Sequence, residues 1–389
     1  MARSRRRANG EGSVFQRKDG RWVMQIWLGD KYKQTYVKSQ KEGIQALKKA
    51  QQELEQGTLA TGPRRKLGEY VEDWLENVHK DKLRLSTYVK YKKLIKYIVA
   101  ELGNVWLQKL TPEQVQRFYT KLGKKKEDGG RGLSPKTIHE VHGVLHLALK
   151  NAVRWSLISR NVCDLVSPPR LVKPDIKPLT MEQAKNLLEV VRGHRLETLL
   201  TMALTTGMRR GELLALRWSD VNLEEGTVIV KHTVDYIARY GYVENEAKTE
   251  AGRRMIILPA FVVDMLKKHR VQQLELRLKA GDSWQNLDLV FTGLHGGYFN
   301  PRYMPKLFNK VLVEAGLPHI CFHNLRHSAA TLLLSMGVNI KMVQEILGHS
   351  DIVVTLGIYG HLLPAMHEEA MSKWDDKLNP NGQGNKEVK

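Results

Sequence analysis

The sequence predicts a multidomain chain: a small three-stranded β-sheet with one helix, then an all-α domain, then a larger mainly-α (α+β) domain. The length of 389 residues exceeds that of one ordinary domain, so two or three are expected. Strand-like alternation is confined to the N-terminal part, and helical spacing of apolar residues dominates most of the rest. Linker-like stretches at 58–66 and 167–180 separate the parts. We therefore expect domains at 1–62, 66–170 and 175–378, with a disordered tail at 379–389.

The composition favours a polyanion as the partner. Lys and Arg number 62 against 41 Asp and Glu, which gives a formal net charge of +21. Such an excess attracts nucleic acid, although a solvated basic surface is the alternative. No stretch is apolar for long enough to cross a bilayer, and residues 1–20 lack an apolar signal segment, so we expect a cytoplasmic protein. Two cysteines, Cys163 and Cys321, cannot form a disulfide framework, which suits a reducing compartment.

The N-terminal domain is expected to contain three short strands and a helix. Residues 1–10 carry four arginines and are expected to be disordered. Asp19-Gly20 and Gly29-Asp30 are turn signals that place strands at about 12–17, 21–28 and 32–38. A helix follows, because apolar residues recur at helical spacing at Ile44, Leu47, Ala50 or Gln51, and Leu54.

The two faces of the middle strand are expected to differ, because side chains alternate along a strand. The face that can pack against the helix carries Trp22, Met24, Ile26 and Leu28. The opposite face carries Arg21, Val23, Gln25 and Trp27, and we place Arg17 and Lys33 of the neighbouring strands beside it. Such a face could enter a DNA groove as a β-ribbon does, and a solvated sheet with an exposed Trp fits equally well. The candidate DNA-binding residues are Arg17, Arg21, Gln25 and Lys33.

Residues 67–170 are expected to be entirely helical, with four or five helices. Thr111 and Ser134, each followed by proline, are N-cap residues, and Gln114 completes a capping box with Thr111. The helix after Ser134 has an apolar side formed by Ile138, Val141, Val144 or Leu145, and Ala148. Lysines crowd this domain, at 90–96, at 121–126 and at Lys136. They fit a basic DNA-binding face, but charged helix faces are usually only solvated.

The last domain is expected to combine helices with a small sheet. Thr180 caps a helix whose inward residues are Ala184, Leu187, Leu188 and Val191. The clearest strands are Val228–Val230 and Met255–Leu258. The domain has no βαβ alternation, no glycine-rich phosphate loop and no long internal repeat.

Two basic residues of this domain occupy positions where an anion could bind. In TTGMRRGELLALRW, residues 205–218, Arg209 lies at a tight helix entrance beside Gly207. A helix N-terminus attracts anions, and an arginine there strengthens the site. The common alternative is a surface Arg209 paired with Glu212 three residues later. Lys248 lies in a turn before a strand, where exposed lysines are ordinary.

The stretch HNLRHS adds further hydrogen-bonding side chains. His323 and Arg326 are three residues apart, so on a helix they share a face and can hold the same phosphate oxygens. His323 and His327 also have the spacing of a zinc pair. Zinc is disfavoured because Asn324 occupies the position where a zincin carries Glu, and no CxxC or carboxylate cluster supplies further ligands. We therefore expect neither a metal nor another cofactor.

The stretch LGHSDIVVTLGIYGHL, residues 347–362, contains a histidine and a tyrosine of interest. His349 follows a helix that ends at Gly348, and Tyr359 stands ten residues later, beside Gly360. A lone tyrosine is usually a half-buried core residue. A tyrosine beside glycine, near a histidine and downstream of two arginines, can also be a nucleophile.

Residues 178–364 resemble the catalytic domain of the tyrosine recombinases, the phage integrase family. The resemblance rests on TGMRRGELLAL, AKT…RR, HNLRHS and LGHSDIVVTLGIYGHL, which occur in the family's order and at family-like separations. Residues 67–170 resemble the family's helical core-binding domain. Residues 12–56 resemble the AP2-like sheet that some integrases use on arm-type DNA sites. Nearly the whole chain is therefore covered.

The resemblance implies a site-specific recombinase that cleaves and rejoins DNA through a 3′-phosphotyrosyl intermediate and so integrates and excises a phage or mobile element. The implied partner is double-stranded DNA that carries core and arm-type attachment sites, on which the protein acts as a homotetramer. Accessory proteins that bend the DNA or set the direction of recombination are also implied, and the implied location is the cytoplasm of a bacterial host. The implied catalytic residues are Arg209, Lys248, His323, Arg326, His349 and, as nucleophile, Tyr359. Arg210 is a rival for Arg209, but the family pattern prefers the first arginine after TGM. In the family a C-terminal helix, here 364–378, often docks on a neighbouring subunit.

Three alternatives stay open. The first is a catalytically silent DNA-binding regulator on the same scaffold, against which the full set of catalytic residues argues. The second is a type IB topoisomerase, which shares the chemistry but needs no arm-like N-terminal domain. The third is a metalloenzyme that uses His323 and His327, which full activity in EDTA would exclude.

Overall fold

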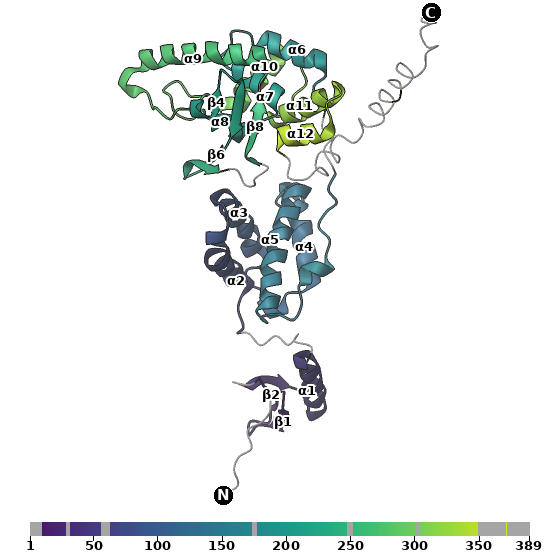
Figure 1. Cartoon of the computed structure of the whole chain (residues 1–389). Helices are drawn as coiled ribbons and strands as arrows, with labels where there is room; N and C mark the ends of the chain where they lie inside the picture. The colour runs from purple at the N-terminus through teal and green to yellow at the C-terminus, as the bar shows by residue number, and fades with distance from the viewer. Residues whose placement is uncertain are drawn as a thin grey trace, which may run out of the picture. The chain divides into compact units, whose positions relative to one another are not determined.

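The computed structural model describes residues 10–28, 32–55, 63–172, 177–246, 252–300, 303–348 and 371. The chain divides into two compact units, residues 1–173 and 174–389, which are described separately (Figure 1). Within the described part, no helix has both the length and the apolar character needed to span a membrane.

The first unit begins with an antiparallel sheet of order β1-β2-β3, formed by β1 (Gly12–Gln16), β2 (Trp22–Trp27) and β3 (Tyr32–Val37). The three strands expected from the turn signals are thus confirmed. Helix α1 (Gln40–Glu55) covers one face, where Met24, Ile26 and Ala50 are buried together. That leaves the opposite face of the sheet as the candidate DNA-binding surface.

Ile44 of α1 lies away from the sheet. It is the first of the apolar residues at helical spacing, but it is 46% exposed. Gly43 lies there instead, and a β-carbon on it would stand 2.6 Å from a methyl group of Val14 and 3.2 Å from one of Val37. The helix approaches the strands so closely at this point that only glycine fits, which turns Ile44 outward.

The second part of this unit is helical throughout, as expected. Its long helices are α2 (Leu67–Trp74), α3 (Leu85–Leu102), α4 (Pro112–Gly123) and α5 (Pro135–Arg154). A π-helical turn at Leu75–His79 follows α2, and 3₁₀ turns lie at Lys80–Lys82, Leu107–Lys109, Lys126–Asp128 and Val162–Leu165. The capping box of Thr111 with Gln114 is confirmed, and the Ser134 side chain accepts a hydrogen bond from the Thr137 N–H. The expected apolar side of α5 lies in the core, with Ile138, Val141, Val144, Leu145 and Ala148 all buried.

The second unit surrounds a small sheet with helices. Its helices are α6 (Met181–Val190), α7 (Glu197–Thr206), α8 (Arg210–Leu214), α9 (Ala260–Ala280), α10 (Tyr303–Glu314), α11 (His323–Ser335) and α12 (Ile340–Leu347), with 3₁₀ turns at Trp218–Asp220 and Gly281–Ser283. The sheet has the order β4-β5-β8, from β4 (Val221–Asn222), β5 (Thr227–Val230) and β8 (Arg254–Ile257). Both expected strands are therefore present within one residue of their predicted limits. A separate hairpin of β6 (His232–Ile237) and β7 (Gly241–Glu246) was not predicted.

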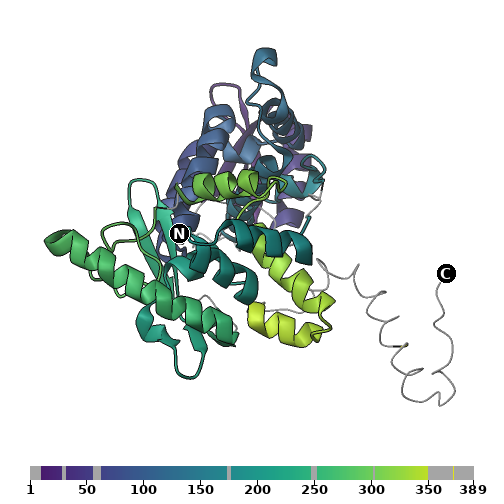
Figure 2. The ribbon, with the colours of Figure 1, turned by 90° about the horizontal axis from the view of Figure 1, so that it is seen from above.

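The packing of this unit brings distant segments together. One apolar core contains residues from α6, α7, β5, α9, α10 and α11. Helix α11 packs against α7 and against α12, which lies beside it in both views (Figures 1 and 2). The start of α11 therefore lies close to the turn between α7 and α8 and to the end of α12.

Candidate functional site

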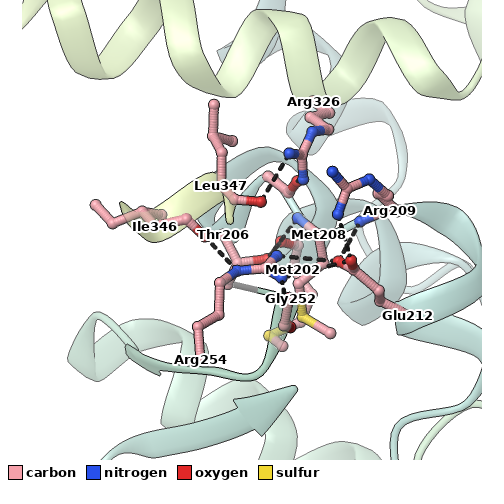
Figure 3. Close-up of polar contacts among 11 residues, drawn as sticks. Met202, Thr206, Met208, Arg209, Glu212, Gly252, Arg254, Arg326, Ile346 and Leu347 are labelled. Atoms are coloured by element: carbon pink, nitrogen blue, oxygen red, sulfur yellow. Dashed lines mark hydrogen bonds and ion pairs between the residues drawn. The ribbon is translucent and has the colours of Figure 1, made fainter. Parts of the chain in front are cut away.

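Four segments of the second unit meet around a group of arginines. They are the turn between α7 and α8, the first residue of β8, the first turn of α11 and the end of α12. Figure 3 shows Arg209, Glu212, Arg254 and Arg326 close together. Glu212 forms ion pairs with Arg209 and Arg254, whereas Arg326 bonds to backbone carbonyls. These residues come from positions separated by more than a hundred residues along the chain, so the site depends on the tertiary fold.

Arg209 occupies the helix entrance that the sequence indicated. It is the N-cap of α8 and has extended backbone geometry. Its backbone N–H and its Nη1 each donate to the Glu212 carboxylate, both at 2.8 Å. The ion pair between Arg209 and Glu212, which the sequence offered as the alternative to an anion site, is thus present. The Arg209 side chain nevertheless stays 42% exposed, so its guanidinium can reach a further anion.

Arg326 is held inside the site by two backbone carbonyls. Its Nη1 donates to the Gly207 oxygen at 2.8 Å and its Nη2 to the Leu347 oxygen at 2.7 Å. The residue is only 3% exposed. These two hydrogen bonds fix the orientation of the planar guanidinium within the site.

Gly207 allows this close approach. It ends α7 in the left-handed conformation with φ of 61°, which glycine adopts without strain. A β-carbon there would stand 2.4 Å from a methyl group of Leu347, the residue whose carbonyl also binds Arg326. Gly207 therefore lets the end of α7, the first turn of α11 and the end of α12 meet at one point.

His323 begins α11 and reaches the surface of the site. Partial burial, together with the charges of Arg326 and Arg209, lowers the pKa of its imidazole below the ordinary value. At neutral pH the ring is therefore mainly uncharged and can accept a proton. His327 lies edge-on to it, with ring centroids 5.1 Å apart, and burial lowers the pKa of His327 to about 4.

Glu212 and Arg254 are two further members of the group. The sequence indicated Glu212 only as a partner of Arg209, and Arg254, the last residue of the AKT…RR stretch, was assigned no role of its own. Arg254 Nη2 donates to Glu212 at 2.9 Å, and the two side chains are each 6% exposed. Burial would raise the pKa of Glu212, but the charges of Arg254 and Arg209 outweigh it, so the pKa is lowered and the carboxylate stays ionised. The sequence signal for Arg254 was its place at the start of β8, where burial alternates: Arg254 and Ile256 point inward, and Leu258, directly after the strand, continues the pattern.

The structure thus brings together three of the six expected catalytic residues, namely Arg209, His323 and Arg326. Lys248, His349 and Tyr359 lie outside the described residues, as does the expected C-terminal helix at 364–378 apart from Met371. The described ranges end at Glu246 and resume at Gly252 on either side of Lys248, and they end at Gly348, the residue before His349 in the sequence. Within the described ranges, no three His, Cys, Asp or Glu side chains form a group with metal-binding geometry.

The free face of the N-terminal sheet is a second candidate surface. Cross-strand pairing puts Ser13, Gln25 and Gln34 in one row, and Gln25 donates to the Ser13 hydroxyl at 3.0 Å. Arg17 donates to the Tyr36 hydroxyl at 2.6 Å, and the Arg21 guanidinium lies 4.9 Å from the centre of the same ring. Arg21 also pairs with Asp19 at 2.6 Å. The face therefore combines amides, arginines and aromatic rings.

The expected place of Lys33 on this face is wrong. Lys33 pairs across the strands with Ile26, which α1 buries, so it lies on the helix side of the sheet. Burial lowers the pKa of its ammonium group, and Glu53 of α1 partly opposes this effect. The strand register, which depends on the length of the turn, decides on which face of the sheet a side chain lies.

Lys136, the candidate DNA-binding residue of the helical domain, is exposed in the first turn of α5.

Comparison with known proteins gives related sequences and folds. The sequence model of the phage integrase family matches residues 177–366, and that of the phage integrase N-terminal SAM-like domain matches residues 66–123. A protein described as tyrosine recombinase XerC-like, from Caldanaerobacter subterraneus subsp. tengcongensis, is 31% identical over 329 residues, which span 80% of this chain and 83% of that protein.

Two solved structures share the fold. The Tn1549 transposon integrase in complex with a circular intermediate DNA superposes with a TM-score of 0.66 at 21% identity, over 79% of this chain and 99% of that one. A lambda integrase tetramer bound to a Holliday junction superposes with a TM-score of 0.53 at 15% identity, over 87% of this chain and 92% of that one. The likeness therefore extends over most of both partners.

Proposed function

Because this chain belongs to the phage integrase family of tyrosine recombinases, we propose that it is a site-specific recombinase that integrates and excises a mobile DNA element. It cleaves and rejoins double-stranded DNA through a 3′-phosphotyrosyl intermediate. The observation that supports this most is the convergence of Arg209, His323 and Arg326 in a chain of net charge +21. Two arginines and an uncharged histidine suit a phosphodiester, whose non-bridging oxygens gather negative charge as it is attacked.

The two arginines hold the scissile phosphate. A guanidinium offers paired N–H donors in one plane, which match two oxygens of a phosphate better than an ammonium group does. Arg326 is fixed by two carbonyls, and Arg209 is braced by Glu212. Their orientation therefore precedes substrate binding, and little reorganisation is needed when charge develops on the phosphate.

The nucleophile in this proposal is Tyr359. Its phenol oxygen forms a bond to phosphorus while the bond from phosphorus to the 5′-oxygen of the next nucleotide breaks. A free tyrosine has a pKa of about 10, so its proton must be removed, and His323 or His349 can accept it. Lys248 donates a proton to the departing 5′-oxygen. The product is a 3′-phosphotyrosyl enzyme with a free 5′-hydroxyl, and attack by a 5′-hydroxyl of another duplex reverses the step without ATP.

The three parts of the chain have separate tasks in the proposal. Residues 1–62 bind arm-type sites, 66–170 bind the core site and 175–378 carry the chemistry, with 379–389 as a tail. Arg17, Arg21 and Gln25 contact the arm DNA, and Lys136 contacts a core-site phosphate. Four copies act together on two duplexes, in the cytoplasm of a bacterial host, with accessory proteins that bend DNA and set direction. Lys33 is left out because it lies on the covered side of its sheet.

The proposed function is tested by recombination between two duplexes taken from the ends of the element that encodes the chain. Rejoined recombinant DNA is expected in buffer with EDTA and without any nucleotide. Relaxation of a supercoiled plasmid that lacks paired sites would indicate a topoisomerase instead. DNA binding without any strand cleavage would indicate a regulator.

Deletion of residues 1–62 is expected to leave core-site cleavage intact and to weaken binding at arm sites, because the amide and arginine face lies in the deleted part. Footprinting on DNA that carries both kinds of site measures the effect. A duplex with the core site alone is the control, and its affinity should not change. Arm-site footprints that survive the deletion would contradict the assignment.

A further inference from the structure

The end of helix α12 is held by side chains from two other elements. The last four carbonyls of an α-helix have no partner within the helix. In α12 the Gly348 N–H donates to the first two, those of Gln344 and Glu345, at 2.9 and 3.0 Å. Arg254 Nε donates to the Ile346 oxygen at 2.6 Å, and Arg326 Nη2 donates to the Leu347 oxygen at 2.7 Å. Two buried arginines therefore complete the cap, where positive charge is also favourable.

Arg254 connects this helix end to the phosphate site. Its guanidinium donates one hydrogen bond to the Ile346 carbonyl of α12 and another to the Glu212 carboxylate. The same carboxylate accepts a hydrogen bond from Arg209. The contacts form a continuous chain from Arg209, the exposed arginine of the site, to Ile346 in the last turn of α12 (Figure 3). Only 6% of the Arg254 side chain is exposed, so this side chain contacts other protein groups and is poorly placed to contact DNA.

We propose that Arg254 is a positioning residue that fixes the end of α12, and with it the start of the segment that carries His349 and Tyr359, against the Glu212–Arg209 pair. The inference rests on the proposed function. In the sequence His349 follows Gly348 directly, so the helix end sets the point from which this segment leaves. A misplacement of about 1 Å at a reacting group can cost roughly a hundredfold in rate. Loss of this tether therefore slows the attack of the tyrosine without removing any group that touches DNA.

A simpler role for Arg254 predicts a different outcome. Because Glu212 also braces Arg209, the reference for this comparison is Glu212→Gln alone. If Arg254 served only to neutralise the Glu212 carboxylate, the double variant Glu212→Gln/Arg254→Met would recover to the rate of Glu212→Gln. If Arg254 positions α12, the double variant stays slower than Glu212→Gln, because the Ile346 carbonyl still lacks its partner.

The test measures covalent adduct formation by the full-length chain on a nicked suicide duplex that carries the core site. At saturating DNA, Arg254→Met is expected to lower the rate constant roughly a hundredfold while the dissociation constant for DNA stays within about threefold of wild type. The final amplitude, which reports the fraction of folded and active enzyme, should be unchanged. A purely structural role would lower the amplitude and leave the rate constant alone. Arg192→Met is the matched control, since Arg192 is an exposed arginine paired with Glu189.

Several outcomes would overturn the inference: a wild-type rate constant in Arg254→Met, a loss of amplitude only, or recovery in the double variant. If Arg254→Met fails to fold, Arg254→Lys keeps the charge beside Glu212 but lacks the planar edge that bonds two partners at once. It should remain slow, and a wild-type rate there would equally overturn the inference. A wild-type chain that forms no adduct would instead refute the proposed function itself.

Discussion

Tyr359→Phe is expected to bind core-site DNA as wild type does and to form no detectable covalent adduct. Phenylalanine keeps the ring but lacks the oxygen that attacks phosphorus. Removal of the nucleophile from a covalent catalytic group lowers the rate by roughly a millionfold in the best-measured case. Because the ring itself remains, affinity for DNA should stay close to that of the wild-type chain.

The measurement is a denaturing gel after incubation with a nicked suicide duplex, in which the cleaved strand cannot be rejoined. Tyr303→Phe serves as the matched control, because Tyr303 of α10 is 61% exposed and has no role in the proposed chemistry. The control should form as much adduct as wild type. An undiminished adduct with Tyr359→Phe would dismiss Tyr359 as the nucleophile.

Arg326→Lys should lose activity by about two to three orders of magnitude, although the charge is kept. The guanidinium bonds the carbonyls of Gly207 and Leu347 at the same time, at 2.8 and 2.7 Å. An ammonium group has no planar pair of donors and cannot present the same face to a phosphate. The substitution also leaves a buried carbonyl without its partner.

Single-turnover cleavage of the suicide duplex measures this loss. Arg192→Lys is the matched control, an exposed position where the same substitution should change nothing. Since the charge at residue 326 is preserved, DNA affinity should fall much less than the cleavage rate. Near-normal cleavage by Arg326→Lys would argue against a geometric role for the guanidinium.

Much of the local structure could be predicted from the sequence, because it depends on near neighbours. The turn signals at Asp19-Gly20 and Gly29-Asp30 in the sequence predicted three strands, and the structure contains them as β1, β2 and β3. The capping box of Thr111 and Gln114 marks the start of α4, and a similar one at Thr180 marks the start of α6. Arg209 was expected at a helix entrance beside Gly207 and is found there. Each of these features depends on residues that lie within about four positions of one another in the sequence.

Contacts between distant segments could not be predicted in the same way. Lys33 was placed on the wrong face because the strand register, and not the alternation alone, decides its neighbours. The exposure of Ile44 could not be predicted, because helical spacing cannot show how closely Gly43 lets α1 approach the sheet. Arg254 lies in the AKT…RR stretch but was given no role, because its partners, Glu212 and Ile346, are 42 and 92 residues away in the sequence.

In the proposed reaction, Arg209, His323 and Arg326 hold the phosphate that Tyr359 attacks. A structure of the chain trapped on a suicide duplex tests this arrangement directly. We predict a covalent bond from the Tyr359 oxygen to the 3′-phosphate, with both guanidinium groups within hydrogen-bond distance of its non-bridging oxygens. A phosphate bound to another residue, or one that lies away from Arg209 and Arg326, would contradict the proposed arrangement.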